Sequence, residues 1–140
     1  MTMAMRFELV SPERRLASKD VRAVRIPGAD GDLAAMEGHT PVVTSLRPGV
    51  LVIETEDGGE ERFAVTGGFA EIGPDSTTVL AERALPASDV TQEVYDDWVA
   101  DARGQAKDAP QDTIDSATKL VEDMVAMGGH IGLDPKQPNL

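Results

Sequence analysis

Residues 49–65, GVLVIETEDGGEERFAV, decide the fold. Two apolar runs, residues 50–53 and 63–65, stand on either side of the polar stretch TEDGGEER. The pair Gly58 and Gly59 tolerates the positive φ angles that a tight turn requires. The pattern therefore predicts a β-hairpin, and antiparallel pairing in this part of the chain.

Short strand-like runs continue on both sides of this hairpin. Turn formers such as PGADGD, RPG and GPDS separate them. The runs are MRFELV (5–10), DVRAVRI (20–26), FAEI (69–72) and TTVLA (77–81). Short strands at this spacing predict an antiparallel β-sandwich or barrel. The β pattern ends near Pro86, so we expect a sandwich domain over residues 1–86 and a second unit over residues 87–140.

The second unit has the period of amphipathic α-helices and predicts a two-helix antiparallel hairpin. We expect Ser88 or Asp89 to cap the first helix, Gly128 and Gly129 to end the second, and the tail LDPKQPNL to be frayed. Trp98 and Tyr95, like Met124 and Met127, are expected to be core residues. The apolar face of the first helix comprises Val90, Val94, Trp98 and Ala102, and that of the second Ile114, Ala117, Leu120, Val121, Met124 and Val125.

Composition excludes several classes of function. The 140 residues include no cysteine, which removes disulfides, thiolate metal sites and cysteine nucleophiles. A net charge of -12 argues against nucleic-acid binding, because a phosphate backbone demands a basic face. No signal-peptide pattern and no run of about 18 apolar residues is present, so we expect no direct insertion into a membrane.

The stretch GDLAAMEGHTPVVTSLRPG, residues 31–49, sets His39 among glycines, prolines and a nearby carboxylate. A general base or a metal site would need a partner at suitable spacing, and the one other histidine, His130, lies far along the chain. The glycine pairs match no phosphate-binding loop. We therefore expect no catalytic residues, no metal and no cofactor, with His39 as a structural turn residue.

Three blocks of the first domain carry a family resemblance. They are Gly31-Asp32-Leu33 with Gly38-His39-Thr40-Pro41 and Leu46-Arg47-Pro48-Gly49; VTGGFAEI at residues 65–72; and VLAE at residues 79–82 followed by Ala84. In this order they resemble the signature of the epsilon subunits of bacterial rotary (F-type) ATP synthases, called delta in mitochondria. That family has a β-sandwich followed by a helical hairpin. Ala34 and Glu37 depart from its usual glycine and proline.

The resemblance implies a non-catalytic subunit of the central stalk, or rotor, which couples proton flow to ATP synthesis. Its implied partners are the gamma subunit, the membrane-embedded c-ring and, as an open alternative, the alpha/beta head. The implied location is peripheral, on the cytoplasmic face of the bacterial inner membrane. The residues implied at the c-ring contact are Ala29, Asp30, Gly31, Asp32, Leu33 and His39.

The helical hairpin departs from the family pattern. Some relatives bind ATP through an I/L-D-x-x-R-A motif, whose Asp and Arg are replaced here by Thr91 and Val94. In relatives whose hairpin inhibits the head, the second helix is basic, whereas residues 113–129 hold Lys119 against Asp115, Glu122 and Asp123. We therefore expect no tight ATP binding and a hairpin that stays folded on the sandwich. The alternative interpretation is a free-standing β-sandwich module that binds a ligand under a helical lid.

Overall fold

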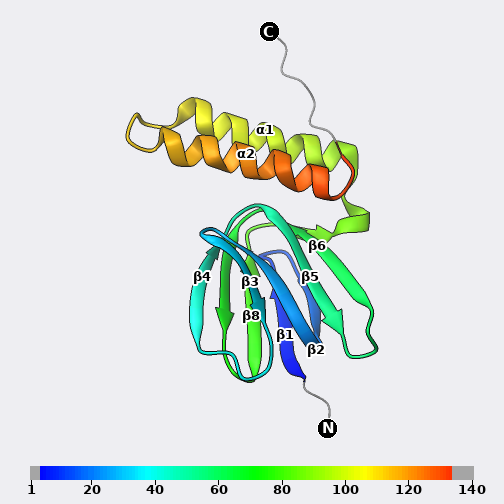
Figure 1. Ribbon diagram of the computed structural model, residues 1–140. Coiled ribbons are helices and arrows are strands. Elements are labelled where there is room, and N and C mark those ends of the chain that lie inside the picture. The colour runs from blue at the N-terminus through cyan, green and yellow to red at the C-terminus, as the bar shows by residue number, and fades with distance from the viewer. Residues whose placement is uncertain (1–3, 134–140) are drawn as a thin grey trace.

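The computed structural model describes residues 4–133 and has a β-sandwich with two helices lying across one end (Figure 1). The fold class expected from the sequence is confirmed. The elements are β1 (Met5–Val10), β2 (Arg15–Gly28), β3 (Gly31–Ala35), β4 (Val42–Leu46), β5 (Gly49–Thr55), β6 (Glu60–Val65), β7 (Gly68–Ile72), β8 (Ser76–Ala81), β9 (Ala84–Pro86), the 3-10 turn η1 (Ala87–Asp89), α1 (Gln92–Asp108) and α2 (Ile114–His130).

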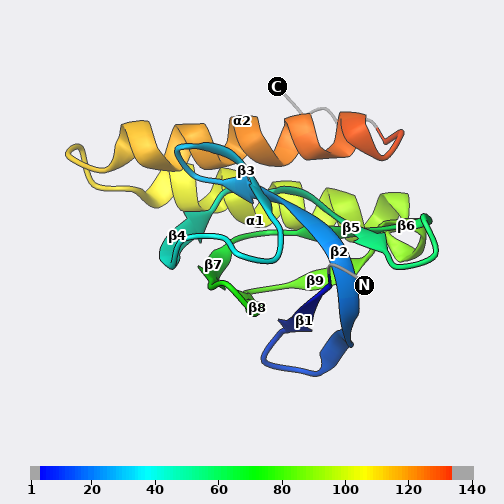
Figure 2. The ribbon, with the colours of Figure 1, turned by 60° about the horizontal axis from the view of Figure 1, so that its bottom comes forward.

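The strands follow the order β1-β8-β7-β4-β2-β5-β6-β9, and β3 pairs with β2. Every pairing is antiparallel except the parallel pair of β1 and β8. Strand β2 joins the two layers, because its first half pairs with β1 and its second half with β3 and β5 (Figure 2). The inward side chains of both layers form the sandwich core, which includes Phe7, Leu9, Val21, Ile26, Leu51, Ile53, Ile72 and Val79.

The hairpin predicted from residues 49–65 is the pair of β5 and β6. Leu51 opposes Phe63, and both side chains are buried. In the connecting turn Gly58 has a φ of 89°. The Thr55 hydroxyl and the Gly59 amide donate hydrogen bonds to the Asp57 carboxylate. These two bonds lower the pKa of Asp57 below its usual value.

Strands β3, β4 and β9 are absent from the sequence prediction, which also began β2 five residues too late. Most side chains of β3 and β4 are exposed or half-buried, so these strands lack the alternation that marks a half-buried strand. The sequence predicts a turn over the whole of PGADGD, residues 27–32. In the structure, Gly31 and Asp32 already belong to β3 and the turn is confined to Ala29 and Asp30.

The helix boundaries differ from the expected ones at two points. Thr91, and neither Ser88 nor Asp89, caps α1: its Oγ1 accepts a hydrogen bond from the Val94 amide at 3.2 Å. At the other end α2 continues through Gly128 and Gly129 to His130. Gly128 serves close helix packing, because a Cβ at this position would lie 2.2 Å from the ring of Tyr95.

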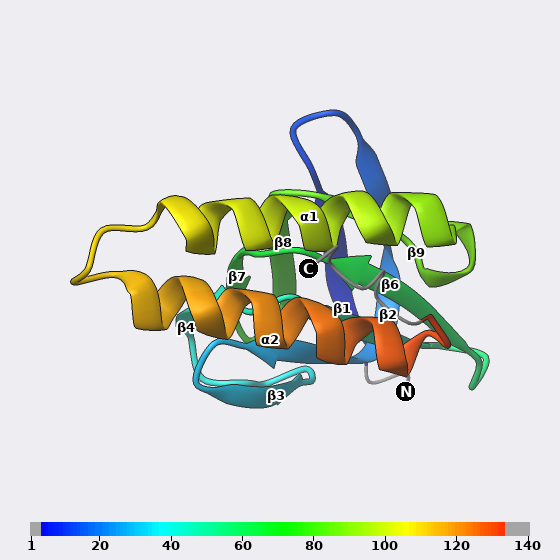
Figure 3. The same cartoon turned by 90° about the horizontal axis from the view of Figure 1, so that it is seen from above.

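The two helices lie side by side over the end of the sandwich (Figures 1 and 3). The Tyr95 hydroxyl donates a hydrogen bond to the Val125 carbonyl at 3.2 Å, joining α1 to α2. A second core lies between the helical hairpin, formed by α1 and α2, and the sandwich. It comprises Ala64, Val90, Tyr95, Trp98, Val99, Ala102, Met124 and Met127. The predicted core roles of the aromatic and methionine side chains are thus confirmed. The tail expected to be frayed lies, from residue 134 onward, outside the described residues.

Candidate functional site

The tip between β2 and β3 is the first candidate contact surface. Gly28 pairs with Gly31 so closely that a Cβ on Gly28 would meet the Gly31 carbonyl oxygen at 2.5 Å. Gly31 itself has a φ of 137°, a backbone angle that residues other than glycine rarely adopt. The Ala29 amide donates to the Ser45 carbonyl at 2.8 Å. Together these features project Ala29 and Asp30 at the apex of a tight turn.

Arg47 holds this turn from the neighbouring β4–β5 connection. Its amide donates to the Pro27 carbonyl at 3.0 Å, and its Nη1 donates to the Gly28 carbonyl at 2.6 Å. Its Nη2 forms an ion pair with Asp32. The sequence motif that contains Arg47 predicts no role for its side chain, because the two turns meet only in the folded chain.

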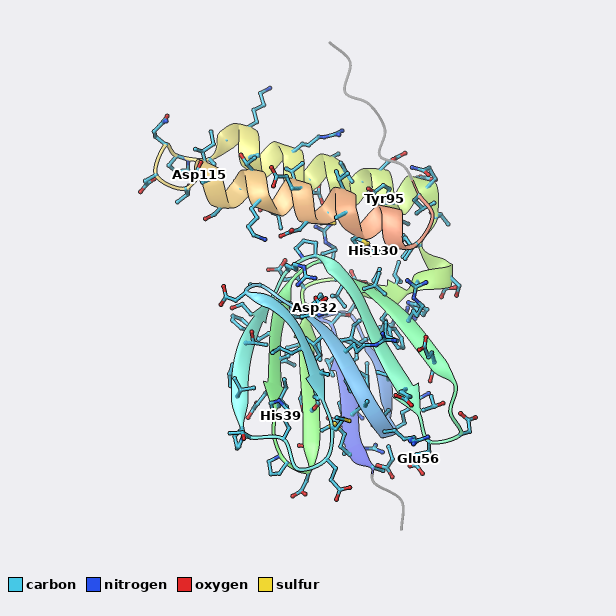
Figure 4. The ribbon with its side chains drawn as sticks, in the orientation of Figure 1. Asp32, His39, Glu56, Tyr95, Asp115 and His130 are labelled. Carbon is cyan, nitrogen blue, oxygen red and sulfur yellow. The ribbon has the colours of Figure 1, made fainter. Side chains whose placement is uncertain are left out.

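His39 lies away from this turn. Figure 4 places Asp32 near the helical end of the sandwich and His39 near the opposite end. The His39 Nδ1 is 2.6 Å from the Thr40 carbonyl oxygen, and its amide donates to the Met36 carbonyl at 3.1 Å. The structure therefore brings Ala29 to Leu33 together as one element but leaves His39 in a separate loop.

The second histidine also stands apart from His39. His130 ends α2 on the side that faces Asp32 (Figure 4). A groove of about 410 Å³ lies between α2 and the sandwich, and its charged lining mixes both signs. Those charged and titratable residues are Arg25, Asp32, Arg47, Asp123 and His130. Within residues 4–133 no group of three His, Cys, Asp or Glu side chains could hold a metal ion.

The start of α1 holds Thr91 and Val94, the two positions that the sequence resemblance aligned with an ATP-binding motif. Here the Thr91 hydroxyl is engaged in the helix cap, and Val94 has no polar atom in its side chain. Arg83, on the wall of the adjacent groove, is ion-paired with Asp101 at 2.7 Å. The Thr91 hydroxyl and the Arg83 guanidinium thus both have protein partners.

Polar contacts also join each of the two helices to the sandwich: Arg83 contacts α1 and Arg62 contacts the end of α2. Besides its ion pair with Asp101, the Arg83 guanidinium lies 6.0 Å from the ring centroid of Trp98. Arg62 donates to the main-chain carbonyl of His130 at 2.9 Å. These contacts flank the buried apolar interface and oppose separation of the hairpin from the sandwich.

An exposed apolar row runs across β7, β8 and β1 on the outer face of the layer that these strands form with β4. Phe69 opposes Leu80, which in turn lies beside Val10. Phe69 and Leu80 are 57% and 54% exposed, and Val43 on β4 is 67% exposed. This row was not predicted from the sequence, although the unbroken apolar run Val79-Leu80-Ala81 indicates a strand with an apolar residue on its outer face. Exposed apolar side chains that lie next to one another are typical of a protein-contact surface.

No helix within residues 4–133 combines the length and apolar character needed to cross a bilayer.

Comparisons with known proteins match both the sequence and the fold. The family model described as "ATP synthase, Delta/Epsilon chain, beta-sandwich domain" matches residues 4–87. The chain is 50% identical to the ATP synthase epsilon chain of Paracoccus denitrificans, over 99% of this chain and 98% of that one. It is 49% identical to that of Rhodobacter capsulatus, over 95% and 100% respectively. Its fold resembles a chain in the mitochondrial ATP synthase structure of Euglena gracilis, with a TM-score of 0.71, 19% identity, and coverage of 92% and 82%.

Proposed function

Because the chain belongs to the delta/epsilon family of ATP synthase subunits, we propose that it links gamma to the c-ring in the central stalk and couples proton flow to ATP synthesis. It is a subunit of an enzyme complex and not the catalytic one. The near-complete coverage of its relatives supports this function over a free-standing ligand-binding module. We propose the cytoplasmic face of the bacterial inner membrane as its location.

The exposed apolar row is the single observation that carries the proposal of a stalk partner. An isolated sandwich gains nothing from placing Phe69 and Leu80 side by side in water, whereas burial against gamma would remove both from solvent. The neighbouring outward row holds Val43 and Thr78 together with two carboxylates, Glu71 and Glu8. An apolar partner surface flanked by Lys or Arg would complement this face.

We assign the c-ring contact to the turn that contains Ala29, Asp30, Gly31, Asp32 and Leu33. Asp30 and Asp32 are exposed, and the close Gly28–Gly31 pairing gives the turn a defined shape. His39 belongs to another loop, so we assign it the structural role of holding that loop. On this proposal the first domain unit, residues 1–86, makes the contacts within the stalk, and the second, residues 87–140, is the helical hairpin.

We further propose that the hairpin is a packing element that neither binds ATP tightly nor acts as the dominant brake. Tyr95, Met124 and Met127 are almost completely buried in the docked arrangement. Undocking would expose apolar surface and break the contacts of Arg83 and Arg62 with the hairpin. A contact with the alpha/beta head stays outside this proposal.

Copurification with gamma and the c-ring tests the proposed function. Tagged chain co-expressed with both should retain them, and Phe69→Ser with Leu80→Ser should release gamma while circular dichroism stays unchanged. A matched control is Met36→Ser with Ile114→Ser, which removes two exposed apolar side chains elsewhere. If wild-type chain retains neither partner, or if both double variants retain gamma equally, the proposal is wrong.

A further inference from the structure

Arg47 is the cation that bridges both sides of the β2–β3 turn. One guanidinium nitrogen donates to the Gly28 carbonyl at the end of β2, and another pairs with Asp32 at the start of β3. The Arg47 side chain is 26% exposed, whereas that of Asp32 is 75% exposed. A guanidinium can make both bonds at once because its donors lie in a rigid planar fork.

The bond to Gly28 is the more important of the two for the shape of the turn. An ion pair with a carboxylate as exposed as Asp32 contributes little, because water screens it. A hydrogen bond from a charged, half-buried donor to a main-chain carbonyl contributes more. Losing it should raise the equilibrium population of the opened turn about tenfold.

The two carboxylates of the turn therefore differ in what they offer a partner. Asp32 is compensated by Arg47. Asp30 lies at the exposed apex, and none of the ion pairs within residues 4–133 includes it. The uncompensated negative charge of this turn is thus on Asp30.

We propose that Arg47 is a positioning residue for the contact turn, with Asp32 as its internal acceptor, and that Asp30 carries the charge that recognises the partner. The partner chemistry that fits is a polar loop with Lys, Arg or free N–H donors. This inference rests on the proposed c-ring contact, since it names the residues by which that contact is made.

Hydrogen exchange of the full-length chain tests the positioning role. The reporters are the amides of Ala29 and Arg47, which bond to Ser45 and Pro27. Arg47→Met should speed exchange at both about tenfold, and Arg47→Lys should restore part of the protection because one ammonium cannot span both acceptors. Arg25→Met, which removes a neighbouring arginine paired with Glu60, should change neither. Unchanged exchange in Arg47→Met would overturn the positioning role of Arg47.

Proton pumping by the assembled enzyme in vesicles tests the charge. Asp30→Asn should lower pumping per ATP hydrolysed and flatten its dependence on salt, without changing the exchange of Ala29. The control Glu56→Gln removes one carboxylate from a turn at the opposite end of the sandwich (Figure 4). Equal behaviour of the two variants would overturn the role of Asp30.

Ala29→Trp separates this inference from the proposed function. A bulky side chain at the apex should disrupt any contact made there, whichever charge recognises the partner. Undiminished pumping in Ala29→Trp would refute the c-ring contact itself, whereas a loss in Ala29→Trp with none in Asp30→Asn would refute only the assignment of the charge.

Discussion

Replacing the adjacent glycines Gly128 and Gly129 of α2 by alanine should change the free energy of unfolding in opposite directions. A Cβ on Gly128 would lie 2.2 Å from both Cζ and Oη of Tyr95, far inside any van der Waals contact. A Cβ on Gly129 would meet nothing within 4 Å. Both substitutions add one methyl group to the same helix, so they differ only in what surrounds it.

The expected magnitudes follow from this difference. Tyr95 is fully buried and bonded to Val125, so it cannot move aside without losing packing or its hydrogen bond. Gly128→Ala should therefore cost about 1–3 kcal/mol of unfolding free energy, as overpacked core sites do. Gly129→Ala should gain up to about 0.5–1 kcal/mol, because alanine restricts the unfolded chain and favours the helix.

Urea denaturation followed by circular dichroism and by the fluorescence of Trp98 would measure both changes. Because Trp98 lies in the interface between hairpin and sandwich, its emission also reports undocking. We expect the Trp98 emission of the native Gly128→Ala variant to shift to longer wavelength, and that of Gly129→Ala to stay unchanged. Stabilisation by both substitutions, or by Gly128→Ala alone, would refute the close approach of the two helices.

Three other variants test separate parts of the structure. Asp32→Lys should weaken coupling in vesicles by placing a second cation beside Arg47, while the unfolding free energy changes by no more than about half a kcal/mol; normal coupling would argue against the contact turn. His39→Ala should cost about 1 kcal/mol or less of stability and leave the isolated chain without ATP hydrolysis, as in the wild type; hydrolysis by the wild-type chain that this variant abolishes would contradict the structural role. Because the pKa of Asp57 is lowered in the folded chain, its carboxylate stabilises the fold above the ordinary pKa of 3.8, and this stabilisation is lost as the pH falls through the folded-state pKa. Asp57→Asn should therefore show a smaller drop of the urea midpoint in acid than the wild type, and an undiminished drop would contradict this role of Asp57.

Regular patterns made much of the fold predictable. The β5–β6 hairpin follows from two apolar runs on either side of a glycine turn, and the docked faces of α1 and α2 follow from apolar residues at helical spacing. Strands β3 and β4 were unpredictable because their exposed side chains carry no such pattern. The cap at Thr91 was not predicted because serine and aspartate are favoured over threonine at an N-cap, whereas Ser88 and Asp89 lie in η1, ahead of the helix.

Contacts between distant segments limited the prediction of the site. The residues from Ala29 to Leu33 could be named by family resemblance, but Arg47 acquires its role only when the β4–β5 connection meets the β2–β3 turn. The row of Phe69 and Leu80 likewise depends on the register between β7 and β8, which a single sequence does not define. From the sequence alone Gly128 predicts the end of a helix, because its close approach to Tyr95 exists only in the folded chain.

The most direct measurement of the central claim is ATP-driven proton pumping by vesicles that carry the complete ATP synthase, before and after removal of this chain. A central-stalk subunit that connects gamma to the c-ring should be required for pumping, so removal should abolish it while ATP hydrolysis by the head continues. Adding back the purified full-length chain should then restore pumping. Pumping that persists at full yield without the chain would contradict its role as a coupling subunit.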